Sequence, residues 1–167
     1  MARADAGATE LHFGDIDLVP HLEKIAGQAG ILAAGKGIQV TRELADGPVR
    51  VFADPAAIER LLLIVVENAE KYTPSGGKFE MRLSNGRENA RIEIRDNGIG
   101  ISDKDLPHIF ERFYRADQAR SREPGGSGLS LAIARWIVDR HSDSIAGQST
   151  LGSGSVFCIA LPIATNR

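Results

Sequence analysis

The sequence is poor in the features that define several classes of protein. A single cysteine, Cys158, excludes an internal disulfide framework and makes a reducing, cytoplasmic setting the simplest expectation. No apolar run reaches the ~20 residues that a membrane-spanning helix needs, so direct membrane insertion is not expected. The net charge of −2 provides no basic field for nucleic acid. The first ten residues lack the apolar core of a signal peptide, and we expect them to be a disordered tail.

What remains is an ordinary globular composition, with 43% hydrophobic and 25% charged residues, which indicates one domain over residues 11–167. Helices are expected at about 19–34, 55–71 and 128–141, and strands from Phe13 and at 38–44, 49–54, 78–85, 90–96, 144–150 and 154–162. The strands 38–44 and 49–54 lie around the turn "ADGP". The last helix should bury the face of Leu129, Ala132, Ile133, Trp136 and Ile137. This order predicts an α+β fold: a two-layer sandwich whose mixed, mostly antiparallel sheet is covered on one face by about three helices.

The helix that follows Asp54–Pro55 ends in a polar cluster. Asn68, Lys71 and Tyr72 border its apolar stripe at the C-terminal end. An amide oxygen can ligate Mg²⁺, a lysine can neutralise phosphate, and a tyrosine can lie against a base. Taken alone, the same three residues also have a purely structural explanation, with Asn68 as a cap, Lys71 as a solvated side chain and Tyr72 as cover for an edge of the core.

The segment "RDNGIGI" (95–101) comes directly after a strand. A carboxylate at Asp96 can accept a hydrogen bond from an adenine amino group, while Gly98 and Gly100 let the backbone approach the ring closely. A plain turn is the alternative. A long polar segment follows instead of a paired strand, which favours a binding site.

Two further glycine-rich segments follow. "PGGSGLSLAI" (124–133) places free N–H groups at the positive end of the last helix, which suits phosphate, although a flexible hinge explains it too. "LGSG" (151–154) is explained by a hairpin turn. Between the glycine segments at 95–101 and 124–133, Arg115 follows Tyr114 and is the best candidate among the arginines to contact phosphate.

In this order, the segments resemble the ATP-binding catalytic domain of bacterial sensor histidine kinases. That domain has the Bergerat fold of the wider GHKL group, which includes HSP90, gyrase and MutL. "ENAEKYTPSGG" is similar to the N box, "DNGIGI" to the G1 box, "IFERFYR" to the F box and "GGSGLSLAI" to the G2 box. The similarity covers about residues 13–163, and four ordered motifs are far more specific than any one alone.

The resemblance implies roles for the matching positions. The expected catalytic residues are Asn68, Lys71 and Arg115, with Asn68 as the magnesium ligand. The expected nucleotide-binding residues are Asn68, Lys71, Tyr72, Asp96, Gly98, Gly100, Ile101, Arg115, Gly126, Ser127, Gly128 and Leu129. Among them, Asp96 would bind the adenine amino group. Residues 102–127 would form a mobile ATP lid.

No phosphoacceptor is recognisable among the histidines. The chain has His12, His21, His108 and His141. None has the helical setting that the family gives its acceptor. We therefore expect the domain to bind Mg·ATP and to phosphorylate a histidine on a separate partner chain. The partner would carry a dimerising helical hairpin and act, indirectly, on a response regulator in a two-component system.

Three other functions stay open. The first is an ATPase of the HSP90, gyrase and MutL type. Such ATPases activate water with a glutamate one turn before the asparagine, and this chain has Ile64 at that place. A non-catalytic nucleotide-binding regulatory module is the second, because the chain also departs from the family pattern at Ser130, Ser142–Asp143 and Val156. An anti-sigma-type Ser/Thr kinase ranks lower, since that group also tends to keep the glutamate.

Overall fold

The computed structural model describes residues 10–111, 130–141, 144–150 and 152–163. The helices are α1 (Leu18–Ala34), α2 (Pro55–Tyr72) and α4 (Ser130–Arg140), with a short 3₁₀ helix η3 (Leu106–His108). The strands are β1 (Gly14–Asp17), β2 (Gln39–Glu43), β3 (Arg50–Ala53), β4 (Lys78–Asn85), β5 (Asn89–Asp96), β6 (Ser144–Thr150) and β7 (Gly154–Pro162).

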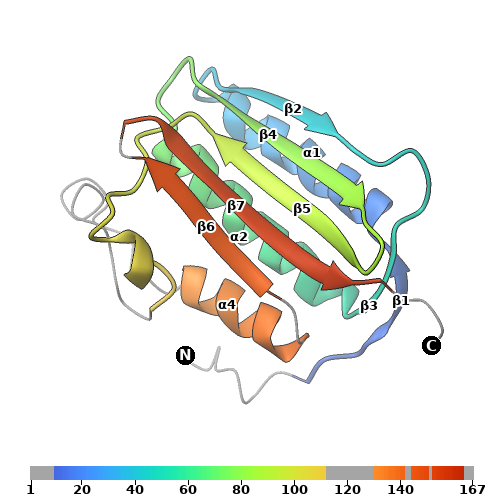
Figure 1. Ribbon diagram of the computed structural model, residues 1–167. Helices are drawn as coiled ribbons and strands as arrows, with labels where there is room; N and C mark the ends of the chain where they lie inside the picture. The colour runs from blue at the N-terminus through green and yellow to red at the C-terminus, as the bar shows by residue number, and fades with distance from the viewer. Residues whose placement is uncertain (1–9, 112–129, 142–143, 151, 164–167) are drawn as a thin grey trace.

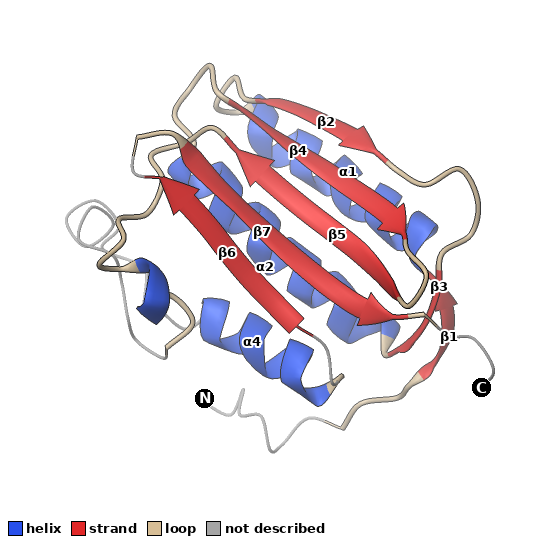
Figure 2. Ribbon diagram, viewed as in Figure 1, coloured by secondary structure: helices blue, strands red, loops and turns tan. Residues whose placement is uncertain are grey.

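The main sheet has five strands in the order β2-β4-β5-β7-β6. β2 pairs with β4 in parallel, and the other neighbours pair antiparallel. The helices α1, α2 and α4 lie together against one face of this sheet, and the other face is open (Figures 1 and 2). The expected two-layer α+β sandwich with a mixed, mostly antiparallel sheet is confirmed.

The strands on either side of the turn "ADGP" do not pair with each other, contrary to the simplest reading of the sequence. β3 pairs instead with β1 in a separate two-stranded sheet, and β2 lies at the edge of the main sheet. The reason is long-range: α1 returns the chain to the far edge of the sheet, where β2 meets β4. The chain then crosses to the end of the helical layer, where β3 leads directly into α2 (Figure 1).

Helix α2 is the centre of the fold. Asp54 caps it by accepting a hydrogen bond from the Ala57 N–H at 2.9 Å, and Pro55 opens the first turn. Its apolar side chains, Ile58 and Leu62 among them, are completely buried against the sheet and α1. Each such side chain contributes about 1.5–3 kcal/mol through burial. This packing fixes both ends of α2 relative to the sheet.

The buried face of α4 differs from the expected one. Ala134, Ile137 and Val138 are buried, whereas Ile133 and Trp136 are only half-buried. Of the expected face, only Ile137 is fully buried among the described side chains. The sequence offers two apolar stripes on this helix, and contact with both α2 and β6 selects the stripe centred on Ala134–Val138.

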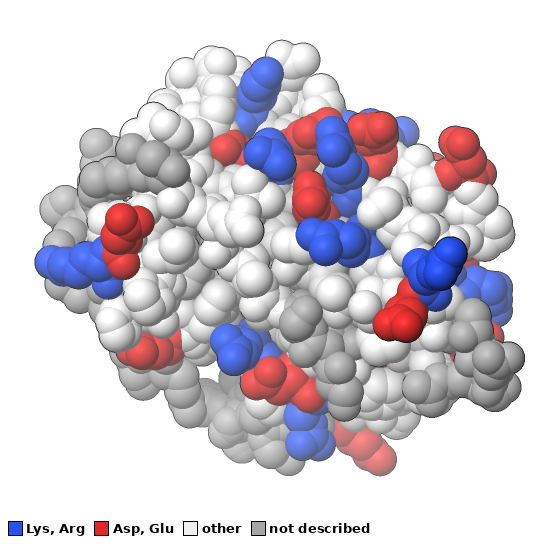
Figure 3. All heavy atoms as spheres, in the orientation of Figure 1, with Lys and Arg blue, Asp and Glu red and all other residues white. Residues whose placement is uncertain are grey.

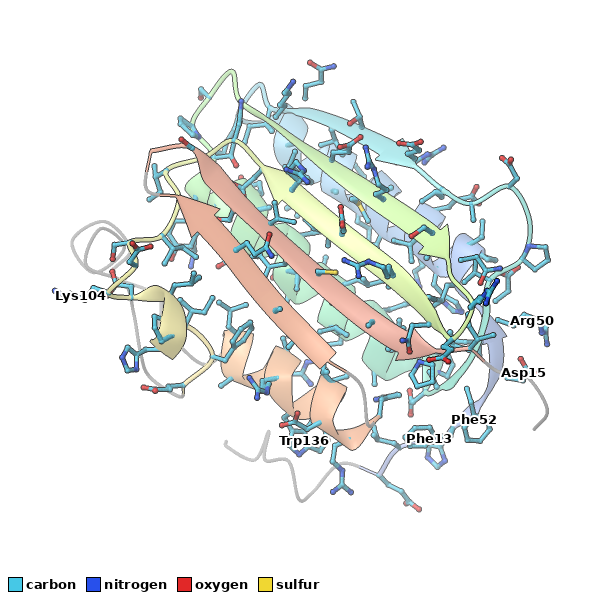
Figure 4. All side chains as sticks on the ribbon, viewed as in Figure 1. Phe13, Asp15, Arg50, Phe52, Lys104 and Trp136 are labelled. Atoms are coloured by element: carbon cyan, nitrogen blue, oxygen red, sulfur yellow. The ribbon has the colours of Figure 1, made fainter. Side chains whose placement is uncertain are left out.

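His141, directly after α4, joins three segments of the chain. Its Nδ1 lies 2.8 Å from the Ile137 carbonyl oxygen, and its Nε2 lies 3.1 Å from the Asp54 nitrogen. The Asp54 N–H can only donate, so the network assigns the imidazole proton to Nδ1. The Phe13 ring packs on the same imidazole at 4.7 Å between centroids. In Figure 4, Phe13 lies beside Phe52 at this end of the molecule.

None of the helices in the described ranges combines the length and apolarity needed to cross a membrane.

Candidate functional site

The polar cluster of α2 lies where α2 and β5 both end, on the opposite side of the molecule from β1 and β3 (Figure 1). Asn68 and Tyr72 are half-buried there, and Lys71 is exposed. The Lys71 ammonium lies 5.7 Å from the centre of the Tyr72 ring. These side chains therefore stand at the boundary between core and solvent, as the sequence predicts.

The loop after β5 is joined to this end of α2 by its backbone. The Ile99 N–H donates to the Tyr72 carbonyl oxygen at 3.1 Å. A Cβ added at Gly98 would overlap that same carbonyl, so only glycine fits there. Gly100 has a positive φ of 74°, which glycine adopts without strain. Two segments that are far apart in the sequence are thus brought into direct contact.

Asp96 ends β5 as a buried carboxylate, with only 7% of its surface exposed. Its Oδ1 accepts hydrogen bonds from the N–H groups of Gly98 at 2.9 Å and Ser155 at 3.3 Å. Within the described ranges, no donor reaches its Oδ2. Burial raises the pKa of Asp96, and the two N–H donors offset only part of that rise. A buried oxygen without a donor is costly in a folded protein. It suits an amino group supplied by a ligand.

The turn between β6 and β7 also supports this loop, which the sequence-based reading as a plain hairpin turn missed. The Gly152 N–H donates to the Ile99 carbonyl oxygen at 2.7 Å. Gly154 has a φ of 108°, and a Cβ there would overlap the Asp96 carbonyl. The two glycines on either side of Ser153 could have revealed this supporting role, since a simple hairpin turn requires fewer glycines.

Two serines also support the loop after β5. Ser149 Oγ accepts from the Ile101 N–H at 2.7 Å and donates to the Gly154 carbonyl oxygen at 2.8 Å. Ser155 is buried, with its Oγ 3.0 Å from that of Ser149. Neither serine was singled out from the sequence, because a serine in a strand is usually solvated.

The site contains no ready-made metal cage. Among the described residues, no group of three or more His, Cys, Asp or Glu side chains could hold a metal ion. Mg²⁺ often keeps its waters and binds one or two protein oxygens together with substrate phosphates. The amide of Asn68, half-buried at the end of α2, fits that mode of binding as a single oxygen donor.

A hollow of about 530 Å³ lies on the open face of the sheet, with Asp96 among its lining residues. Arg95, Lys78 and Val156 line it, and they point away from the helices because side chains alternate along a strand. Figure 3 shows basic and acidic side chains next to each other on this face. Val156, where the family often has threonine, therefore lies in this hollow. Its neighbour Ser155 is the residue that contacts Asp96.

Several expected site residues belong to the segment 112–129. Arg115, Gly126, Ser127, Gly128 and Leu129 lie outside the described residues, and so does most of the expected lid.

Of the departures from the family pattern, Ser142–Asp143 also lies outside the described residues, and Ser130 begins α4. Ile64 packs in the core with 8% exposure, one turn before Asn68. Glu67, the neighbouring carboxylate on α2, is exposed.

Residues 53–165 match the family model described as "Histidine kinase-, DNA gyrase B-, and HSP90-like ATPase". The chain therefore belongs to this family of ATPase domains. The curated proteins to which the chain is similar include sensor histidine kinases. The chain is 41% identical to sensor histidine kinase RppB of Synechocystis over 79% of its own length and 29% of that protein. It is 32% identical to the histidine-protein kinase BaeS of Escherichia coli over 98% of its own length and 35% of that protein.

The chain thus spans about a third of the length of these curated relatives. Among solved structures, mycobacterial sensor histidine kinase MprB superposes with a TM-score of 0.80 at 27% identity, covering 90% of this chain and 98% of that one. Full-length ShkA, solved in complex with AMPPNP, superposes with a TM-score of 0.83 at 27% identity, covering 98% of this chain and 34% of that one. These matches agree with the fold of the described residues.

Proposed function

We propose that this domain binds Mg·ATP and donates the γ-phosphoryl group to a histidine on a separate partner chain. The observation that carries the proposal is Asp96: a buried carboxylate with one oxygen that receives no hydrogen bond from a described residue, joined through its loop to the end of α2. That oxygen would accept the adenine amino group. Family membership supports ATP as the nucleotide, and the sensor histidine kinases among its relatives support histidine as the acceptor.

In the proposed reaction, a ring nitrogen of the partner's histidine attacks the γ-phosphorus of ATP. The bond between that phosphorus and the β–γ bridging oxygen breaks, and ADP leaves with the electron pair. Such a transfer needs positioning and charge neutralisation more than covalent help from the protein. Asp96 would orient the base, and Lys71 would face the phosphates. Mg²⁺, bound to Asn68 and the phosphates, would supply positive charge when present.

The proposed roles of Arg115 and of the backbone of residues 126–129 remain predictions, because these residues are not described. The partner would carry the acceptor on a dimerising helical hairpin, and a response regulator would receive the phosphoryl group from it. Within the described residues, the imidazoles of His21, His108 and His141 each lie within hydrogen-bond distance of another group of the domain, whereas His12 is bound through its backbone N–H.

Steady hydrolysis of ATP is disfavoured by the surroundings of α2. The residue one turn before Asn68 is Ile64, which is buried and cannot act as a base. The adjacent Glu67 is exposed and lies about 100° around the helix from Asn68. The geometry therefore favours transfer to a partner over activation of water.

Calorimetric titration with Mg·ATP tests nucleotide binding. Replacing Asp96 with asparagine should weaken binding about 10- to 100-fold, because a charged hydrogen-bond partner of the base is lost. Arg95→Ala is the matched control: it changes the preceding residue of β5 on the opposite face and should leave affinity unchanged. Equal affinity of wild type and Asp96→Asn would contradict the proposed adenine site.

Incubation with γ-labelled ATP and a hairpin that carries the acceptor histidine tests the transfer. An acid-labile label on the hairpin is expected, since phosphohistidine is acid-labile and phosphoserine is not. Nucleotide binding without any label would favour a non-catalytic regulatory module. Rapid release of labelled phosphate without the hairpin would favour an ATPase.

A further inference from the structure

The last turn of α2 depends on the rest of the protein for its hydrogen bonds. A helix leaves its final four carbonyl groups without partners inside the helix. Here each of the four accepts from outside the helix: Ala69 from Thr73 Oγ1 at 2.6 Å, Glu70 from Lys36 Nζ at 2.8 Å, Lys71 from Lys36 Nζ at 3.5 Å, and Tyr72 from the Ile99 N–H at 3.1 Å. One side chain, Lys36, therefore serves two of the four carbonyls.

The backbone around Lys36 is itself held firmly. The Ile38 N–H donates to the Ala33 carbonyl oxygen at 3.0 Å, and the Gly37 N–H donates to the Ala34 carbonyl oxygen at 3.3 Å. Gly37 has a φ of 68°, and Ile38 is buried. These are the features of a Schellman motif, which ends α1 and fixes the direction of Lys36. The ammonium thus reaches α2 from a rigid turn.

The charge of Lys36 acts where a polyphosphate would lie. The C-terminal end of a helix carries a partial negative charge of about half an electron, which repels anions. Asn68 and Lys71, the proposed contacts for magnesium and phosphate, are in this last part of α2. The Lys36 side chain is 35% exposed, and its ammonium also lies 3.9 Å from the Glu70 carboxylate, so its charge offsets both that carboxylate and the helix end.

We propose that Lys36 is a positioning residue for the phosphate and magnesium part of the nucleotide site. It holds the backbone of Glu70 and Lys71 and neutralises the helix end, so that Asn68 and Lys71 are presented to the phosphates. The inference rests on the proposed function. The adenine part of the site does not involve Lys36 directly, because the hydrogen bonds to Asp96 come from Gly98 and Ser155. Loss of Lys36 should therefore affect charged nucleotide and adenosine differently.

Three variants test this. Lys36→Met removes the ammonium and keeps the aliphatic stem, and Lys36→Arg keeps a positive donor. Lys24→Met is the matched control, because Lys24 also reaches from α1 to α2 but binds Glu59 near the other end of that helix, at 2.8 Å. The readouts are the dissociation constant for Mg·ATP by calorimetry, that for adenosine by chemical-shift titration, and the melting temperature.

Lys36→Met should weaken the binding of Mg·ATP about fivefold, because one charge at the helix end is lost together with its hydrogen bonds. Adenosine affinity should stay within about twofold, since Asp96 keeps its donors. Lys36→Arg should restore Mg·ATP binding, and Lys24→Met should leave both ligands unaffected.

Unchanged Mg·ATP affinity in a folded Lys36→Met protein would overturn the inference and leave the proposed function standing. Equal weakening of both ligands, with a lower melting temperature and no rescue by arginine, would also overturn it, because that result reflects only stability. If the wild-type protein bound no nucleotide, the proposed function would fall and this inference with it.

Discussion

The two ends of α2 are stabilised in different ways. At its beginning, Asp54 caps the helix with its own side chain, and His141 and His12 bind the same residue. At its end, the carbonyls of the last turn are served mainly from elsewhere, by Lys36 and by the loop after β5. Figure 4 shows Phe13 and Phe52 at the first end and Lys104 at the opposite side of the molecule.

Because of this difference, we expect the first end of α2 to matter for stability and the last end to matter for nucleotide binding as well. The first end depends on a local cap and on aromatic packing, and none of its residues belongs to the proposed site. The last end places Asn68, Lys71 and Tyr72, and its geometry depends on contacts from two other segments, the turn at Lys36 and the loop after β5. Substitutions at the first end should therefore change the free energy of unfolding, whereas substitutions at the last end should also change nucleotide affinity.

The largest effect is expected for Gly98→Ala, at the last end. The new Cβ would overlap the Tyr72 carbonyl and break the junction between α2 and the loop. We expect a loss of about 2–4 kcal/mol in the free energy of unfolding, together with at least about tenfold weaker Mg·ATP binding. Urea denaturation and calorimetry measure both quantities. In the control, Gly47→Ala, the added methyl group meets open space and should change stability by less than about 1 kcal/mol.

At the first end, Asp54→Ala should cost about 1–2 kcal/mol at neutral pH, through loss of the cap. Affinity for Mg·ATP, measured on the folded variant, should stay within about twofold of wild type, because the site lies at the other end of the helix. A large loss of affinity would show that the two ends are coupled and would contradict the separation.

The charge of Asp54 gives this end a pH dependence. Burial acts to raise its pKa, but hydrogen bonds from the backbone N–H groups of His12, Ala57 and Ala56 outweigh it, so the pKa lies below the ordinary value of 3.8. The stabilisation is therefore present above pH 3.8 and is lost as the pH falls through the lower, folded pKa. Asp54→Asn keeps a cap without the charge. The stability difference between it and wild type should shrink below about pH 4, as followed by urea denaturation.

The smallest effect is expected for Glu59→Gln, in the first half of α2. Glu59 pairs with Lys24 at 2.8 Å and with His21 at 2.6 Å, and 23% of its side chain is exposed. Such pairs contribute up to about 1 kcal/mol and weaken with salt. Thermal melts at low and high salt should show a difference from wild type that fades as salt rises. A salt-independent loss would indicate packing instead.

Local patterns were sufficient to predict most elements of the fold. Asp54 and Pro55 mark the start of α2, and alternating residues mark the two antiparallel hairpins of the main sheet. The parallel pairing of β2 with β4 could not be predicted in this way, because it depends on where α1 returns the chain. The buried stripe of α4 was predicted only in part for a similar reason: neighbouring elements, and not the helix itself, decide which stripe is covered most completely.

The site was predictable to the extent that its residues occur in contiguous motifs. Asn68, Lys71 and Tyr72 lie at one end of α2, and Asp96 lies beside them through the loop that follows it. Lys36 was missed because a lysine before a glycine resembles a solvated turn residue. The support from Gly152 was missed because its partner, Ile99, is distant in the sequence.

The junction among Tyr72, Ile99 and Gly152 is built from main-chain groups, since the Ile99 N–H and carbonyl oxygen make both hydrogen bonds. Its geometry does not require a particular side chain at position 99. For laboratory evolution, this means that the side chain at position 99 can be varied while the path of the loop is conserved. A saturation library at Ile99 would vary the side chain next to the proposed adenine site and could be selected for recognition of other nucleobases, whereas Asn97 should be kept because its Oδ1 accepts from the Lys78 N–H at 2.9 Å.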